Sequence, residues 1–314
     1  MAASASQQLF LDVEAAVLQV VRGNPQAVRL SLATILARGH LLLEDVPGVG
    51  KTTLARALAK VLGVGFSRVQ FTADLLPSDL VGIPILDARE GTLRFKKGPL
   101  FTNVVLADEI NRASPKTQSA LLEAMADRSV SVDETTWELP KPFHVLATQN
   151  PVEHHGAYPL PESQLDRFLI CLSLGYPPAA DELNLLVSNT TSEGGLSSLA
   201  TLLDAAQLAA AQEQVALITL NDVVGRYLLS IVEGTRRHPD IELPCSPRGS
   251  LAWASLVRAL AFLDGRSFVS ADDVKQTAGA VLGHRLGLRG AVGHSRKRVL
   301  AVVDEIVSSV PAPR

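Results

Sequence analysis

The hydrophobic positions of the chain follow two different patterns, which change near residue 176. From about residue 40 to residue 175, short apolar runs alternate with segments of helical periodicity, which is typical of a mostly parallel sheet covered by helices. We expect strands at five of these runs, over residues 40–44, 67–71, 103–108, 143–148 and 168–174. The first 20 residues carry acidic side chains within an apolar stretch, so they predict an amphipathic helix rather than a signal peptide.

Alanine- and leucine-rich helical patterns replace the strand pattern after Pro177 and Pro178. A stretch rich in Ser, Thr and Gly interrupts them over residues 188–198, and it predicts a mobile loop. The fold class is therefore α/β. We expect one domain over residues 1–176, built on the parallel sheet, and a smaller helical domain over residues 177–314.

The strongest local signal is a strand, a glycine-containing loop and a helix over residues 40–62. Glycines let successive backbone N–H groups turn toward phosphate oxygens, and the helix N-terminus adds partial positive charge. Lys51 is expected to reach the β- and γ-phosphates of a nucleotide, and the hydroxyl of Thr52 to bind Mg²⁺. The predicted phosphate-binding loop (residues 46–53) consists of Val46, Pro47, Gly48, Val49, Gly50, Lys51, Thr52 and Thr53.

One residue departs from the general form of such loops. The general form has a glycine five residues before Gly50, where this chain has Asp45. The alternative is an ordinary turn that happens to precede a lysine. The strand before the loop and the helix after it favour nucleotide binding.

A second chemical signal is a buried strand that ends in two acids, Asp108 and Glu109. In a parallel sheet, the end of this strand lies beside the phosphate-binding loop. Asp108 suits a Mg²⁺ ligand that acts through water, and Glu109 suits the base that orients or deprotonates an attacking water. The alternative is a pair of acids that caps the helix after them.

Together these segments resemble the AAA+ superfamily and, within it, the MoxR family. The matching runs are EDVPGVGKT (44–52), QFTADLLPSDLVG (70–82), ADEINRA (107–113), ATQNP (147–151) and YPLPESQLDRF (158–168). The resemblance implies a P-loop domain with two inserted β-hairpins and a smaller all-α lid domain. It also implies Mg²⁺-dependent ATP hydrolysis, and Asp45 matches the MoxR form of the loop.

The resemblance implies roles for three further polar residues. Asn150 would be the first sensor of the γ-phosphate, although Asn-Pro also favours a plain turn. Arg167 would be the arginine finger that one subunit donates to its neighbour's ATP, or else part of a surface Asp-Arg pair. Arg248 would be the second sensor. Ser246 and Pro247 predict a helix start that puts Arg248 in the first turn, where the helix dipole disfavours a cation unless a phosphate offsets the cost.

Two predicted hairpins bear on nucleic-acid binding. The first covers residues 83–97, turns near Glu90 and Gly91, and carries a basic run that is more often a solvated strand face than a binding site. The second covers residues 129–139, and its tip, Asp133 and Glu134, would repel phosphate. The chain has a formal net charge of −3. Nucleic acid is therefore not expected as a partner.

Two adjacent histidines, His154 and His155, lack a third ligand at metal spacing. We interpret them as loop residues, with lining of a central pore as the alternative. The chain has only two cysteines, Cys171 and Cys245, and no apolar run long enough to span a bilayer. A cytoplasmic location is expected.

The predicted function is ATP hydrolysis by a homo-oligomeric ring, expected to be a hexamer, that remodels, matures or activates a protein complex. The resemblance implies a protein client and a partner with a von Willebrand factor A domain. A DNA-remodelling motor and a slow nucleotide-dependent switch are the alternatives.

Overall fold

A five-stranded parallel sheet forms the centre of the computed structural model, which describes residues 5–87, 91–133, 135–150, 158–188, 192–290 and 296–313. The strand order is β2-β5-β8-β1-β9. The strands are β1 (Leu41–Glu44), β2 (Phe66–Gln70), β5 (Val104–Asp108), β8 (His144–Gln149) and β9 (Ile170–Leu172). All five predicted strands are confirmed, with ends shifted by one or two residues. Because β8 lies between β5 and β1, the ends of these three strands meet at one edge of the sheet.

Each face of the sheet has its own hydrophobic core, because successive residues of a strand point to opposite faces. Leu41 and Leu43 of β1 belong to a core shared with α1, α2, α3 and the C-terminal helices. Leu42 belongs to the core on the other face, together with Leu121 and Leu122 of α5. The sheet is therefore buried between two layers, as its continuous apolar runs predict.

The N-terminal segment and the segment after the phosphate-binding loop are helical, as predicted. The helices are α1 (Ala5–Val20), α2 (Pro25–Leu36), α3 (Lys51–Val61), α4 (Pro77–Val81), η1 (a 3-10 helix, Ile110–Arg112), α5 (Pro115–Asp127), α6 (Glu162–Leu165), α7 (Ala179–Ser188), α8 (Ser192–Ser198), α9 (Ala205–Ala216), α10 (Asp222–Arg237), α11 (Pro247–Leu263), α12 (Ala271–Leu282) and α13 (Arg296–Ser309). Within the described ranges, none of these helices is both long and apolar enough to cross a membrane.

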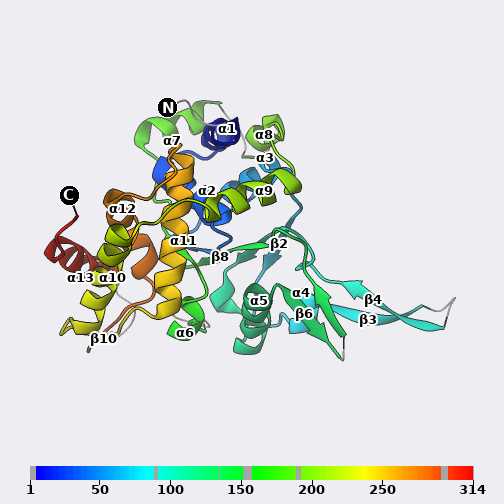
Figure 1. Cartoon of the computed structure of the whole chain (residues 1–314). Coiled ribbons are helices and arrows are strands. Elements are labelled where there is room, and N and C mark those ends of the chain that lie inside the picture. Colours follow the sequence, from blue (N-terminus) through cyan, green and yellow to red (C-terminus); the bar gives the residue numbers. More distant parts are fainter. Residues whose placement is uncertain are drawn as a thin grey trace.

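Both predicted hairpins are present. The first consists of β3 (Gly82–Asp87) and β4 (Thr92–Lys97) and projects away from the body of the molecule at the right of Figure 1. The second consists of β6 (Ser129–Val132) and β7 (Thr135–Glu138). The ring of Phe95 stacks on that of Trp137 with centroids 4.7 Å apart, so the two hairpins support each other near their bases. Residues 88–90 and 134 lie outside the described residues.

The C-terminal helices α10 to α13 gather on the left of Figure 1. They are joined by one short antiparallel pair, β10 (Ile241–Leu243) and β11 (Gly287–Leu288), which the sequence pattern did not reveal. Strands of two and three residues are too short to show an alternation. Residues of α11 share one continuous core with α1 and α2. The division at residue 176 stays a prediction.

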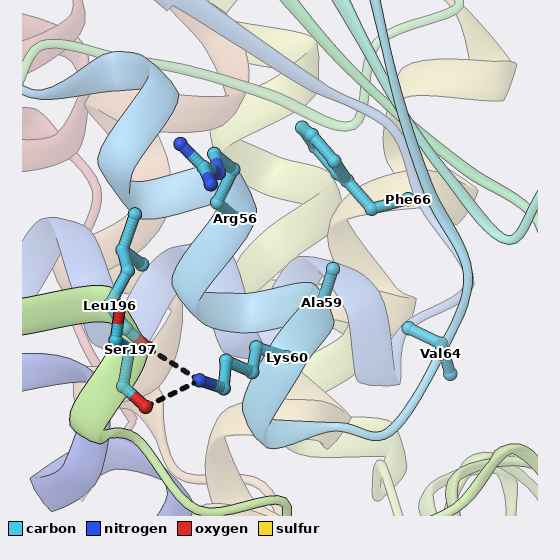
Figure 2. A pocket seen from close by; sticks show the side chains of 7 residues that line it. All are labelled: Arg56, Ala59, Lys60, Val64, Phe66, Leu196 and Ser197. Carbon is cyan, nitrogen blue, oxygen red and sulfur yellow. Dashed lines mark hydrogen bonds between the residues drawn. The ribbon is translucent and has the colours of Figure 1, made fainter. Parts of the chain in front are cut away.

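The predicted loop over residues 188–198 is wrong for its second half. Residues 192–198 form α8, whereas residues 189–191 lie outside the described part of the chain. Figure 2 shows the reason: the Nζ of Lys60, on α3, donates to the carbonyl oxygens of Leu196 at 2.6 Å and Ser197 at 2.9 Å. The last carbonyls of a helix lack partners within it, so Lys60 satisfies two of them and holds α8 on α3.

Candidate functional site

The predicted phosphate-binding loop has the backbone that its glycines allow. Gly48 and Gly50 adopt φ angles of 86° and 95°, and Lys51 begins α3 directly afterwards. A Cβ atom added at either glycine would meet no protein atom within 4 Å. The space in front of the loop is therefore open, and the N-terminus of α3 lies beside it. This arrangement fits a phosphate group.

Lys51 lies near the acids Asp108 and Glu109, and their charges act on its ammonium group. Its Nζ donates to the carbonyl oxygens of Asp45 at 2.7 Å and Val46 at 3.2 Å. Burial lowers the pKa of Lys51, and the charges of Asp45, Asp108 and Glu109 oppose that shift. A partly buried ammonium among hydrogen-bond acceptors is stabilised further by an anion, which is what a nucleotide phosphate would supply.

Asp45, the departure from the general loop pattern, joins the loop to the segment after β9. Its Oδ2 accepts hydrogen bonds from the backbone N–H groups of Leu174 at 2.7 Å and Gly175 at 2.9 Å, and from the hydroxyl of Ser173 at 3.0 Å. A glycine at this position could make none of these bonds. The aspartate therefore anchors the start of the loop.

Asp108 and Glu109 share one hydroxyl group. Thr148, at the end of β8, donates to Oδ1 of Asp108 at 2.6 Å and accepts from the backbone N–H of Glu109 at 2.8 Å. Glu109 has left-handed backbone angles, φ 57° and ψ 50°. Such angles cost a non-glycine residue roughly 1–2 kcal/mol. The chain changes direction here, between the end of β5 and η1.

Both acids are held by residues of β2 in this structure. Oδ2 of Asp108 accepts from Nη2 of Arg68 at 2.6 Å, and Oε2 of Glu109 accepts from Nε2 of Gln70 at 2.8 Å. Arg112 also pairs with Oε2 of Glu109 at 3.0 Å. Protein side chains therefore orient both carboxylates.

Asn150 lies at the same edge of the sheet as the loop and the two acids. It directly follows β8, which is flanked by β1 and β5, and it is buried. The strand order thus brings Asn150, Lys51 and Asp108 to one end of the sheet.

Arg167 and Arg248 lie at the opposite edge. Both line a cavity of about 500 Å³ together with Gly39 and His40, which precede β1. The strands are parallel, so residues before β1 lie at the edge where strands begin, and the phosphate-binding loop lies where they end. A four-residue strand separates these edges by about 13 Å. Neither arginine joins the phosphate-binding loop of its own chain.

The cavity, called here the arginine cavity, has an excess of positive charge. Its charged lining residues are Arg38, Arg128, Arg167, Arg248, Arg285, Asp127 and Asp166. Arg167 donates to the carbonyl oxygen of Leu122 at 2.5 Å. Arg285 is buried and pairs with Asp166 at 2.9 Å. Burial lowers the pKa of Arg285, against the opposing charge of Asp166. Such a lining favours an anionic ligand.

Similarity to known proteins agrees with this arrangement. Residues 40–170 match the ATPase family associated with various cellular activities (AAA), and residues 233–306 match the AAA lid domain. The chain is 46% identical to "Uncharacterized protein YeaC" of Bacillus subtilis, over 94% of this chain and 92% of that protein. It is 37% identical to "Chaperone MoxR1" of Mycobacterium tuberculosis, over 95% of this chain and 81% of that protein. The chain belongs to the MoxR family of AAA+ ATPases.

A crystal structure agrees with this assignment. A candidate ATPase from Cytophaga hutchinsonii superposes on this MoxR-family chain with a TM-score of 0.87 and 34% identity, over 98% of this chain and 96% of the other. The predicted fold, a P-loop domain with a helical lid domain, is confirmed. The protein is an ATPase, and its AAA domain binds nucleotide.

Gln70 and Arg285 are among the residues of this MoxR-family site that sequence reasoning missed. Gln70 ends the strand beside β5, and this position alone could have indicated its contact with Glu109. Arg285 contacts Asp166 across 119 residues, and no local pattern predicts such a contact. The helix start at Ser246, in contrast, is confirmed: its hydroxyl accepts from the N–H of Gly249 at 3.0 Å.

The remaining predictions concern His154, His155, the tip of the second hairpin and the two cysteines. His154 and His155 lie outside the described residues, as does Glu134. Among the residues that the structure describes, no three His, Cys, Asp or Glu side chains gather as a metal cluster. Cys171 and Cys245 are both free and buried.

Proposed function

We propose that this MoxR-family ATPase hydrolyses ATP at sites shared between neighbouring subunits of a closed ring, expected to contain six copies. One observation carries the proposal: Arg167 and Arg248 lie at the edge of the sheet opposite to the phosphate-binding loop of their own chain. A head-to-tail contact between copies would bring the arginine cavity of one subunit to the loop of the next, and such contacts close into rings when the rotation permits.

Each residue has a distinct role in the proposed reaction. Lys51 and the backbone N–H groups of the phosphate-binding loop would hold the phosphates, while the hydroxyl of Thr52 and the carboxylate of Asp108 would hold Mg²⁺. When bound, Mg²⁺ neutralises charge on the phosphate oxygens. Glu109 orients the attacking water and accepts its proton, and Asn150 contacts the γ-phosphate from the end of β8. The neighbour's Arg167 and Arg248 stabilise the negative charge that develops during transfer.

The donors present fit a hard cation, since Mg²⁺ prefers hydroxyl and carboxylate oxygens. Both oxygens of Asp108 already have partners, in Thr148 and Arg68. The positive charge of Arg68 beside Oδ2 opposes a second cation bound directly there, so a contact through water fits this arrangement better. The proposal therefore keeps Asp108 as a ligand that acts through water.

Mixing two inactive variants tests the shared site. Arg167→Ala and Glu109→Gln should each bind ATP and hydrolyse it poorly. A mixed ring contains junctions at which an intact Glu109 meets a neighbour's intact Arg167, so ATP turnover by the mixture should exceed the sum of the separate variants. If Arg167 acts within its own chain, every site stays broken and mixing restores nothing.

Two controls make a negative result decisive. Crosslinking shows whether mixed rings form. Adding each variant to the parent protein shows whether one broken site silences a whole ring. Mixed rings that show neither rescue nor silencing would contradict the shared site.

For the biological role, we infer chaperone-like remodelling, maturation or activation of a protein complex in the cytoplasm. The name "Chaperone MoxR1" of one relative and the resemblance to MoxR proteins support this role. From the same resemblance we infer a partner that has a von Willebrand factor A domain. Acidic Asp133 and Glu138 on the second hairpin argue against DNA as the client. Mass spectrometry of proteins that co-purify with ATP-bound Glu109→Gln tests the role. Recovery of nucleic acid instead of a protein complex would contradict it.

A further inference from the structure

Three distant segments meet at the end of β1, immediately before the phosphate-binding loop. Arg296, the first residue of α13, donates through Nη1 to Oε2 of Glu44 at 3.3 Å and through Nη2 to the carbonyl oxygen of Cys171 at 2.7 Å. Glu44 is the last residue of β1, and Cys171 belongs to the edge strand β9. A single guanidinium thus links the last helix of the chain to two strands of the sheet.

The ion pair is well shielded from solvent. The side chain of Arg296 is 22% exposed and that of Glu44 is 14% exposed. The other carboxylate oxygen of Glu44 accepts from Nε2 of Gln149, on β8, at 2.8 Å. Glu44 is therefore fixed from two sides, and loss of Arg296 would leave a largely buried carboxylate without its cation.

The position of Arg296 in its helix also points to a specific role. A cation at a helix N-terminus is disfavoured by the helix dipole, so Arg296 needs the compensation that Glu44 and the Cys171 carbonyl provide. The rest of α13 is anchored in the C-terminal domain through Val299, Val303 and Ile306, which are buried. Arg296 therefore gives α13 a direct contact with the end of β1.

The end of β1 in turn holds the lysine of the phosphate-binding loop. Asp45 follows Glu44 directly, and its carbonyl oxygen accepts from Nζ of Lys51 at 2.7 Å. The contacts thus run from Arg296 to Glu44, along one peptide to Asp45, and from there to Lys51. A shift at Glu44 would displace the group that positions Lys51.

We propose that Arg296 is a positioning residue, which holds the end of β1 in the form that accepts nucleotide and couples the orientation of α13 to nucleotide binding. This inference rests on the proposed function, because it takes residues 46–53 as the ATP site. Arg296 itself touches no phosphate in this scheme. Its effect should appear in nucleotide affinity and KM rather than in kcat at saturating ATP.

The test compares Arg296→Met with Arg298→Met by titration with a fluorescent ADP analogue. Arg298 is an exposed arginine in the same helical turn, so its variant changes net charge equally without touching Glu44. Arg296→Met should raise Kd about 5-fold, the order expected for loss of one coupled contact, whereas Arg298→Met should bind as the parent does. Arg296→Lys, which keeps the charge but not the two-pronged donor, should fall between them.

A double variant tests whether Arg296 acts on nucleotide binding through Glu44. If Arg296 acts through Glu44, then Glu44→Gln should weaken binding by a similar factor, and combining it with Arg296→Met should add little. Additive losses would overturn the coupling. Should Arg296→Met fail to fold in a melting experiment, Glu44→Gln removes the same ion pair and carries the same expectation.

Lys51→Ala distinguishes failure of the positioning role from failure of the proposed ATP site. If the parent binds the ADP analogue, Lys51→Ala does not, and Arg296→Met binds as tightly as Arg298→Met, the positioning role is overturned and the proposed function stands. If Lys51→Ala binds as the parent does, the proposed ATP site itself is wrong.

Discussion

The carboxylate of Asp166 accepts a hydrogen bond from the hydroxyl of Ser246 at 2.9 Å, across 80 residues of chain. Asp166 directly precedes Arg167, and Ser246 caps the helix whose first turn contains Arg248. The second oxygen of Asp166 pairs with Arg285. The two arginines assigned to the neighbour's ATP are therefore fixed relative to each other by one acid, which makes them a single unit.

Removing the Ser246 hydroxyl should lower both stability and ATP turnover, whereas removing a comparable helix cap elsewhere should lower stability alone. Ser246→Ala loses both a helix cap and the bond to Asp166, and it should lower stability by about 1 kcal/mol. Ser270→Ala is the matched control, because Ser270 caps α12 and bonds only within its own helix start. Both variants should lose similar stability in urea denaturation, but only Ser246→Ala should lower ATP turnover. Equal activities would contradict the linked unit.

The fold was predictable where signals are local or periodic. Leu41 to Leu43, Val104 to Asp108 and the Ser246 cap are short patterns with direct physical meaning, and the structure has them in place. The pairing of Asp166 with Arg285 and Ser246 was not predictable, because it depends on how the C-terminal helices pack against the sheet. The same dependence hid the position of Arg248, at the edge of the sheet opposite to the loop.

Local signals misled in one segment. The Ser- and Gly-rich run before residue 198 favours a loop by propensity, but tertiary contacts override it. Leu196 is buried, and Lys60 satisfies carbonyl groups at the end of α8. The sequence of a segment does not indicate which distant lysine will stabilise it.

Acid should destabilise the protein through two buried histidines, His40 and His144. His40 accepts at Nδ1 from the N–H of Val145, and His144 lies 2.9 Å from the carbonyl oxygen of Gly39 through Nδ1. Burial lowers the pKa of His40 to about 3, with the charge of His144 second, and burial lowers that of His144 to about 4. Both are therefore neutral when folded at pH 7.

The lowered pKa values of the two histidines set the direction in which stability changes with pH. The unfolded chain takes up these protons near pH 6.5, before the folded chain does, so their contribution is complete above pH 6.5 and is lost as pH falls toward 4 and 3. The slope is about 1.4 kcal/mol per pH unit for each histidine. Urea denaturation at pH 7.5, 6.0 and 5.0 measures it. A free energy of unfolding that stays constant over this range would refute the prediction.

Asp45→Gly would give the loop its general form and should nevertheless weaken it. The substitution removes the acceptor for Leu174, Gly175 and Ser173 and adds backbone freedom. We expect a loss of roughly 1–3 kcal/mol in stability and a higher Kd for ADP. Asp45→Asn keeps one carbonyl oxygen and should retain part of both. Asp45→Gly that melts and binds like the parent would show that the anchor is dispensable.

Assembly should depend on nucleotide if the site lies between subunits. ATP bound at a junction contacts residues 46–53 of one subunit and Arg167 of the next, so binding stabilises the junction by linkage. Sedimentation velocity at tens of micromolar protein should show larger species with ATP and Mg²⁺, measured in Glu109→Gln so that turnover does not consume the ligand.

Lys51→Ala is the control that should not respond, since it lacks the cation that faces the phosphates. Arg167→Ala should bind ATP yet assemble less, which separates loss of the junction from loss of the nucleotide. One unchanged monomer in every condition would count against a shared site, because a complete site would then have to form within a chain whose arginine cavity and loop lie at opposite edges of the sheet.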